Sequence, residues 1–208
     1  KIKKKYSIND IKIILDKFKR LKTLVIGETI IDKYTFCEAL GKSGKEPILA
    51  FRKKNDKILI GGSAVVAKNL SYFCKQVNLI SYIGEKKEHL SFIKKTKPRN
   101  CNYNFIYKKE SPTIVKRRYI DQVSSSKIFS AYEINDKILE KKENIKLTSI
   151  INKNIKKNDL TICLDYGHGF IDSKIAKLIS KKSNFFSLNS QINAANIGYQ
   201  ECIMVNKL

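Results

Sequence analysis

The sequence lacks long apolar runs and has few histidines. No stretch of about 18 apolar residues occurs, so no membrane-spanning helix and no membrane partner are expected. Two histidines, His89 and His168, are too few for a zinc site, and no metal-ligating residue is assigned. The N-terminal segment KIKKKYSIND has neither an initiator Met nor an apolar core behind its basic residues. It is therefore not a secretory signal, and we expect the chain to be a piece of a longer protein.

Paired cysteine motifs are also absent. The five cysteines are odd in number and widely spaced, and no CxxC occurs: Cys37, Cys74, Cys101, Cys163 and Cys202. Cys163 and Cys202 lie in apolar runs, which is typical of small core residues. A reduced, cytoplasmic location is the simplest interpretation.

Acidic residues are scarce relative to basic ones. Lys and Arg number 42 against 19 Asp and Glu, which gives a formal net charge of +23. The lysines are scattered along nearly every segment and do not form a basic stripe interleaved with aromatics, as single-strand binders use. This pattern favours solvated lysine faces over a nucleic-acid partner, although a basic nucleic-acid-binding protein stays a rival hypothesis. A basic surface also favours anionic small molecules such as phosphorylated sugars.

Apolar periodicity predicts helices and strands in alternation. Ser7 is a plausible N-cap for a helix over about 8–20, and TLVIGETIID, VNLISYIG and DLTICLDYG are typical of buried strands. Strands separated by helices indicate parallel pairing with helical crossovers. Further helices are predicted near 63–75, 85–95, 137–156 and 172–182, and short strands at NFFSLNS and ECIMVN.

Two sections, near 46–60 and 103–133, break this alternation. They contain consecutive strand-like stretches, including YNFIYK, PTIVKRRYI and SKIFSAYEI, without helices between them. We expect them to form a small, separate antiparallel sheet that is inserted into the α/β body.

Ligands of open α/β sheets bind outside the carboxyl ends of the strands. That rule selects five places here: Glu28–Asp32, Gly61–Gly62, Asp165–Gly169, Asn189–Gln191 and Asn206. These places carry the candidate functional residues.

Three of the candidates concern a hydroxylated or anionic ligand. Asp32 could accept hydrogen bonds from two neighbouring sugar hydroxyls, or it could be an ordinary turn aspartate. Gly61 and Gly62 would let a ligand approach the main chain at the start of a helix, but the GK[ST] of a Walker A loop is absent. In SPTIVKRRYI, Lys116 and Arg118 share one strand face, where they could clamp a phosphate or merely guard an edge strand.

The segment LDYGHGFI carries two further candidates. Asp165 stands at the end of a strand, where it could orient a metal-bound water or a lysine on the phosphate side of a site. His168 lies between two glycines and could contact a substrate. Both residues could equally serve loop structure, and for His168 we favour that structural role.

The order of six segments resembles the ribokinase-like (PfkB) carbohydrate kinases: VIGETIIDKY, GGSAVVAKNL, YIGE, SPTIVKRRYI, LDYGHG and MVN. EALGKSGKEP and NSQINAANIGY are similar to the heptose-7-phosphate kinase part of bifunctional ADP-heptose synthases and to related kinase/nucleotidyltransferase fusions. The resemblance runs from about residue 21 to the end. Residues 1–20 are then an N-terminal helix or linker.

The resemblance implies an α/β fold, a ribokinase-like Rossmann-type sandwich. It would have a mainly parallel central sheet and a small β-sheet lid formed by about 33–60 and 103–133. The C-terminal part of the domain would be missing from 21–208. Because the lid of this family often pairs two subunits, a homodimer is expected.

The implied activity is ATP-dependent phosphorylation of a sugar or sugar phosphate, with heptose 7-phosphate as the best guess and ATP and Mg²⁺ as cofactors. Asp32 would bind sugar hydroxyls, and Gly61 and Gly62 would lie beside the sugar. Lys116 and Arg118 would hold a sugar phosphate.

On the cofactor side, Asn206 matches the first residue of the family's Asn-x-x-Glu element, which helps organise magnesium and ATP phosphates. Asn189 and Asp165 are assigned to the same side. The family's catalytic aspartate would lie after Leu208, so no catalytic residue is assigned and residues 1–208 alone are expected to be inactive.

Two departures weaken this reading. Val65 stands where the family usually has an Asn that contacts the sugar, and Asn189 with Ser190 replaces a frequent Asp-Pro pair. A non-catalytic sugar-binding or regulatory module of the same fold is therefore the alternative.

Overall fold

The computed structural model describes residues 6–191, and a five-stranded sheet forms its centre. The strand order is β5-β4-β1-β8-β9, and every pair is parallel, as the alternation of helices and strands predicted. The strands are β1 (Lys22–Gly27), β4 (Gln76–Gly84), β5 (Cys101–Lys108), β8 (Leu160–Asp165) and β9 (Phe186–Ser190). The predicted strand ECIMVN and Asn206 lie outside the described residues.

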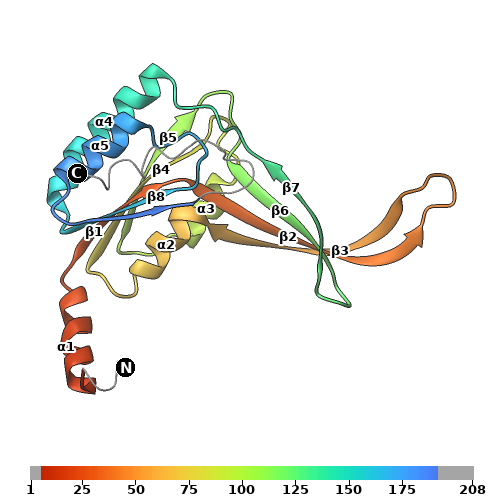
Figure 1. Cartoon of the computed structure of the whole chain (residues 1–208), viewed down its shortest axis with the longest axis horizontal. Coiled ribbons are helices and arrows are strands. Elements are labelled where there is room, and N and C mark those ends of the chain that lie inside the picture. The colour runs from red at the N-terminus through yellow and green to blue at the C-terminus, as the bar shows by residue number, and fades with distance from the viewer. Residues whose placement is uncertain (1–5, 192–208) are drawn as a thin grey trace.

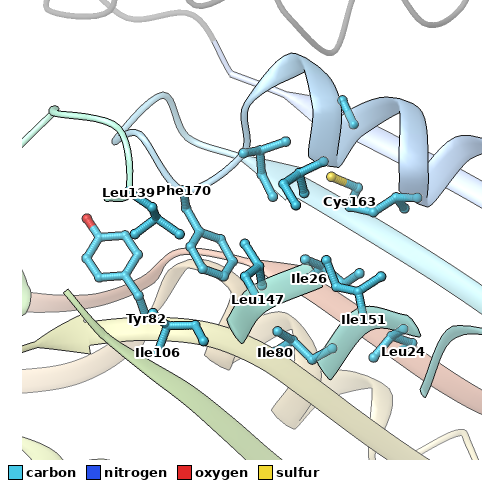
Figure 2. Close-up of a cluster of buried hydrophobic side chains, with 14 of the residues drawn as sticks. Leu24, Ile26, Ile80, Tyr82, Ile106, Leu139, Leu147, Ile151, Cys163 and Phe170 are labelled. Carbon is cyan, nitrogen blue, oxygen red and sulfur yellow. The ribbon is translucent and has the colours of Figure 1, made fainter. Parts of the chain in front are cut away.

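Helices cover both faces of this sheet (Figure 1). On one face lie α4 (Lys141–Asn154) and α5 (Ser173–Lys182), and on the other lies α2 (Gly62–Leu70). Because side chains alternate along a strand, Leu24 and Ile26 of β1 pack toward α4 and α5, whereas Val25 packs with Ala64 of α2. Figure 2 shows the larger of these two apolar cores between the strands and the helices.

The expected helices form, although each is shorter than predicted. The helix predicted over 85–95 is α3 (Leu90–Thr96), which follows His89 in a left-handed conformation. The helix predicted over 137–156 begins at Lys141. Glu140 is the N-cap of this helix, because its carboxylate and that of Glu143 each accept a backbone hydrogen bond.

A second, four-stranded sheet has the order β3-β2-β6-β7. It consists of β2 (Thr29–Lys42), β3 (Leu49–Gly61), β6 (Ile114–Asp121) and β7 (Lys127–Glu133). The expectation of an antiparallel sheet holds for β2–β3 and β6–β7 but is wrong for β2–β6, which is parallel. Alternation of apolar and polar residues indicates that a strand has two unequal faces, but it does not indicate whether the strand runs parallel or antiparallel to its neighbour.

Two predicted boundaries also need correction. The stretch TLVIGETIID is not one strand, because Glu28 separates β1 from β2 and places Asp32 inside the second sheet. The stretch YNFIYK, expected in the lid section 103–133, forms β5 at the edge of the central sheet. An edge strand that is half-buried shows the same alternation as a lid strand, so the pattern could not separate them.

The helix α1 (Ile8–Phe18) begins at the expected N-cap, where Ser7 and Asp10 form a reciprocal capping box. It stands away from the two sheets (Figure 1). None of its residues is buried by the described part of the chain. None of the helices that the structure describes has the length and apolar character needed to cross a membrane.

Candidate functional site

Two glycines and two carboxylates meet where the central sheet joins the second sheet. Gly61 ends β3 opposite Ile30 of β2, and a Cβ at Gly61 would collide with the carboxylate of Asp32. Gly62 begins α2 with φ +58°, and a Cβ there would meet the carbonyl oxygen of Glu28. We expected the glycines to leave space for a ligand. In the structure, the space beside Gly61 already holds the Asp32 carboxylate.

An ion pair fixes Asp32 on the second sheet. Arg118 Nη1 donates a hydrogen bond to Asp32 Oδ1 at 2.5 Å, and both side chains are partly exposed. The guanidinium also lies 5.5 Å from the centre of the Tyr34 ring, because the parallel register sets Tyr34 opposite Arg118. Asp32 thus has a fixed orientation, with Oδ2 beside Gly61.

Lys116 lies opposite Asp32 in the same register. Partial burial lowers the pKa of its ammonium, and the Arg118 charge acts in the same direction, whereas Asp32 and Glu28 oppose it. Its Nζ also lies 5.8 Å from the centre of the Tyr132 ring. The structure therefore brings Asp32, Gly61, Lys116 and Arg118 together, as the sequence predicted; their roles toward a ligand stay predictions.

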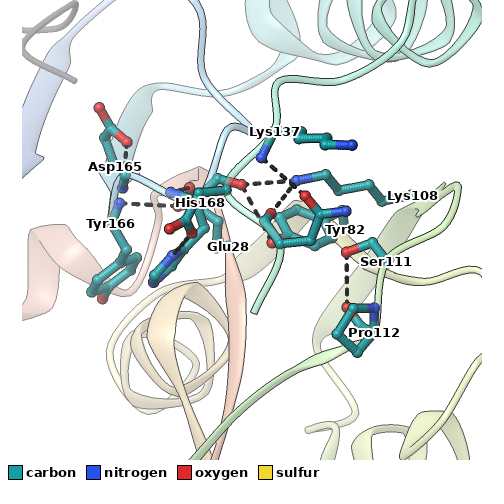
Figure 3. Close-up of polar contacts among 12 residues, drawn as sticks. Glu28, Tyr82, Lys108, Ser111, Pro112, Lys137, Asp165, Tyr166 and His168 are labelled. Carbon is teal, nitrogen blue, oxygen red and sulfur yellow. Dashed lines mark hydrogen bonds and ion pairs between the residues drawn. The ribbon is translucent and has the colours of Figure 1, made fainter. Parts of the chain in front are cut away.

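Glu28 lies in the place Glu28–Asp32 that the strand-end rule selected, but the sequence analysis assigned it no role. It is fully buried, and its two carboxylate oxygens accept hydrogen bonds from the backbone N–H of Tyr166 at 3.1 Å and of His168 at 3.2 Å (Figure 3). Burial, with a smaller contribution from Asp165, raises the pKa of Glu28 to about 7. The sequence did contain a signal for this residue: a glutamate lies between two apolar strands, where burying a charge costs free energy.

A second missed group lies beside it. The Lys108 ammonium is nearly buried and donates to the carbonyl oxygens of Asn135 at 2.6 Å and His168 at 3.0 Å. It also lies 5.0 Å from the centre of the Tyr82 ring. Burial lowers the pKa of Lys108 to about 8. Figure 3 shows how these contacts hold the turn after β8 against β4 and β5.

His168 is buried within this network. Its Nδ1 lies 2.7 Å from Asp136 Oδ1, and burial lowers its pKa, which favours the neutral ring. Its Nε2 has no hydrogen-bond partner among the described residues. The backbone N–H and carbonyl contacts of His168 fit the structural role that we favoured.

The residues predicted for the cofactor side are less well assembled. Asp165 is buried, and its Oδ1 accepts a hydrogen bond from Gly167 N at 2.9 Å, which serves the turn. Asn189 is exposed on β9, opposite Leu164. Within residues 6–191, no group of three or more His, Cys, Asp or Glu side chains is arranged to hold a metal ion.

The chain was compared with known proteins. No family model matches it. Curated relatives named Bifunctional protein HldE include those of Helicobacter acinonychis, 30% identical over 165 residues, and of Aliarcobacter butzleri, 27% identical over 186 residues. These alignments cover 78% and 88% of this chain but 35% and 38% of the relatives. The chain thus spans little more than a third of the length of the curated relatives it matches.

Solved structures resemble the fold closely enough to classify it. Phosphofructokinase-2 from Escherichia coli aligns with a TM-score of 0.63 at 12% identity, over 89% of this chain and 57% of its own. Arabidopsis thaliana ribokinase, complexed with ribose and ATP, aligns with a TM-score of 0.52 at 15% identity, over 81% and 53%. The chain has a ribokinase-like fold. The resemblance to ribokinase-like carbohydrate kinases and to HldE proteins, inferred from the sequence motifs, is confirmed.

In the ribokinase-like fold of this chain, the candidate site lies at the junction of the two sheets. Asp32 and Lys116 come from neighbouring strands of the second sheet, and Glu28 and the turn after β8 come from the carboxyl ends of the central strands. This is the edge at which open α/β sheets bind ligands.

Proposed function

We propose that this chain carries the acceptor-sugar part of a carbohydrate kinase that phosphorylates a sugar or sugar phosphate with ATP. Heptose 7-phosphate is the substrate we favour, as a step toward a nucleotide-sugar precursor of lipopolysaccharide. The observation that carries the proposal is the convergence of the Asp32 carboxylate, the Gly61–Gly62 backbone and two cations at one junction. Sequence relatives named HldE support it.

The two cations would have different tasks. Arg118 is already engaged with Asp32, so it orients the carboxylate that accepts hydrogen bonds from sugar hydroxyls. Lys116 has no ion pair among the described residues, and its partly buried ammonium would attract the phosphate of the acceptor. This division refines the expectation that both residues contact the phosphate.

Only part of an ATP site fits the described residues. Asn189 is exposed at the end of β9 and could contact a nucleotide, whereas Asp165 is buried and engaged by its own turn. ATP with Mg²⁺ would supply the transferred phosphoryl group and neutralise its charge. We assign no general base among residues 6–191.

A non-catalytic sugar-binding module of the same fold is the second candidate. It is favoured by Val65, half-buried in α2, where a polar contact to the sugar was expected. Both candidates predict sugar binding, so phosphoryl transfer by the longer protein separates them.

The proposal also includes a homodimer formed through the second sheet. Large apolar side chains are half-exposed on this sheet: Leu40, Leu49, Phe129 and Tyr132. Sedimentation across a range of protein concentrations would test this assembly. A cytoplasmic location and the absence of nucleic-acid and membrane partners stay predictions.

The direct test is calorimetric titration of the chain with heptose 7-phosphate. Asp32→Asn should weaken binding at least about tenfold, because the variant loses the ionised acceptor for sugar hydroxyls. Asp56→Asn is the matched control, since Asp56 lies on the same sheet and pairs with Lys33 and Lys53. Equal affinity of Asp32→Asn and the wild type would overturn the assignment of Asp32.

A further inference from the structure

Glu28 connects three of the elements that border the candidate site: β2, α2 and the turn after β8. It lies between β1 and β2, and its carbonyl oxygen accepts a hydrogen bond from Ser63 N at 2.8 Å, in the first turn of α2. Its side chain reaches the turn after β8 through Tyr166 and His168 (Figure 3). One residue therefore links the diglycine segment to this turn.

The two side-chain contacts depend on the charge of Glu28. An ionised carboxylate accepts hydrogen bonds at both oxygens, whereas a protonated one carries a donor on one of them. A backbone N–H cannot pair with that donor. Protonation of Glu28 therefore weakens the hydrogen bond from either the Tyr166 or the His168 N–H, at a cost because the Glu28 carboxyl is fully buried.

Tyr166 extends this effect to the candidate site. Its side chain is half-buried, and burial raises the pKa of its phenol, with smaller contributions from the charges of Glu28 and Asp32. The phenol thus lies within the electrostatic reach of Asp32. A turn whose Tyr166 N–H contact weakens would let this side chain shift relative to Asp32.

We propose that Glu28 is a positioning residue for the proposed sugar site: in its ionised form it anchors the Tyr166–His168 turn, and its protonation weakens acceptor binding. This proposal rests on the proposed function of the Asp32 site. Glu28 itself does not touch the substrate.

The surroundings of Glu28 place its titration in the neutral range. Burial is the largest cause of the raised pKa of about 7, and Asp165 adds to it. The other titratable groups that interact with Glu28 come from several elements: Tyr82 of β4, Lys108 of β5, Lys116 of β6 and Tyr166 after β8. The two cations favour ionised Glu28, so neutral and ionised forms both occur near physiological pH.

Nuclear magnetic resonance of the ¹⁵N-labelled chain tests the anchor without any sugar. The amide signals of Tyr166 and His168 should titrate together with a midpoint near pH 7 in the wild type, and should be flat in Glu28→Gln. Asp136→Asn removes the partner of the His168 ring and should leave this titration in place. A midpoint near pH 7 that persists at both amides in Glu28→Gln would overturn the proposal. Wild-type amide signals that do not shift with pH would also overturn the proposal, even if Glu28→Gln failed to fold.

Binding of heptose 7-phosphate tests the consequence. If only the ionised form binds, affinity at about pH 6 should be roughly tenfold weaker than at about pH 8, and Glu28→Gln should lack this change. Ionisation of the sugar phosphate itself is common to both proteins and cancels in the comparison. Equal pH dependence in the two proteins would overturn the positioning role while leaving the sugar site intact. If the Tyr166 and His168 amide signals titrate but heptose 7-phosphate does not bind at any pH, the proposed function would be overturned, and the anchoring role of Glu28 would stand.

Discussion

The two sheets of this chain differ in how far their side chains are buried. The central sheet is covered on both faces, so its inner strands β1, β4 and β8 are mostly buried, and alternate residues of β1 enter separate cores. The second sheet leaves most of β3 and β7 exposed and carries charged side chains along its strands. We therefore expect stability to reside mainly in the first sheet, and the ligand contacts that we propose lie on the second. Glu28 and Asp32, four residues apart, lie on either side of this division.

The largest expected effect follows from the difference in burial. Ile80→Ala removes a fully buried side chain from the larger core and should destabilise the chain by about 3 kcal/mol. Leu49→Ala, at a residue that is 64% exposed on β3, should change stability by less than about 0.5 kcal/mol. Urea unfolding measures both. Similar losses would show that the second sheet is as important for stability as the first.

The next effect is a pH dependence from Glu28. Its pKa rises from 4.5 to about 7 on folding, so the folded state holds a proton that the unfolded state has lost. Stability should therefore be highest below about pH 4.5 and fall by roughly 3 kcal/mol as the pH rises to 7, with no further loss above that. Glu28→Gln should remove this slope. The difference between the two proteins isolates Glu28 from other groups.

Chemical denaturation at several pH values checks this prediction. Glu110→Gln, at an exposed glutamate, is the control and should retain the wild-type slope. A wild-type stability that rises between pH 4.5 and 7 relative to Glu28→Gln would contradict the sign worked out above.

A smaller effect is expected at the glycine beside Asp32. Gly61→Ala should force the Asp32 carboxylate aside and cost about 1–2 kcal/mol, together with weaker sugar-phosphate binding. Gly44→Ala is a matched control, because a Cβ there would meet no atom within 4 Å. Thermal unfolding and calorimetry report the two effects. Unchanged affinity in Gly61→Ala would show that the position of Asp32 is unimportant for the ligand.

These residues also show what the sequence could reveal. Periodicity predicted the helices and the parallel central sheet, because burial on defined faces leaves a repeating pattern. The strand-end rule and the family motifs found Asp32 and Gly61, since both depend on local sequence. The direction of β6 relative to β2 was not accessible. The strand-end rule selected the segment Glu28–Asp32, but the role of Glu28 was not found, because its partners Tyr166 and His168 are about 140 residues away in the chain.

The smallest effect concerns the Arg118 guanidinium. Arg118→Lys keeps the positive charge but loses the planar fork that orients Asp32, so affinity for a sugar phosphate should fall by a few-fold. Stability should change by less than about 1 kcal/mol, because the pair is partly exposed and water screens it. Calorimetric titration beside thermal unfolding separates the two quantities. A loss of affinity as large as that of Asp32→Asn would mean that Arg118 contacts the ligand itself, whereas unchanged affinity would mean that Asp32 needs no fixed orientation.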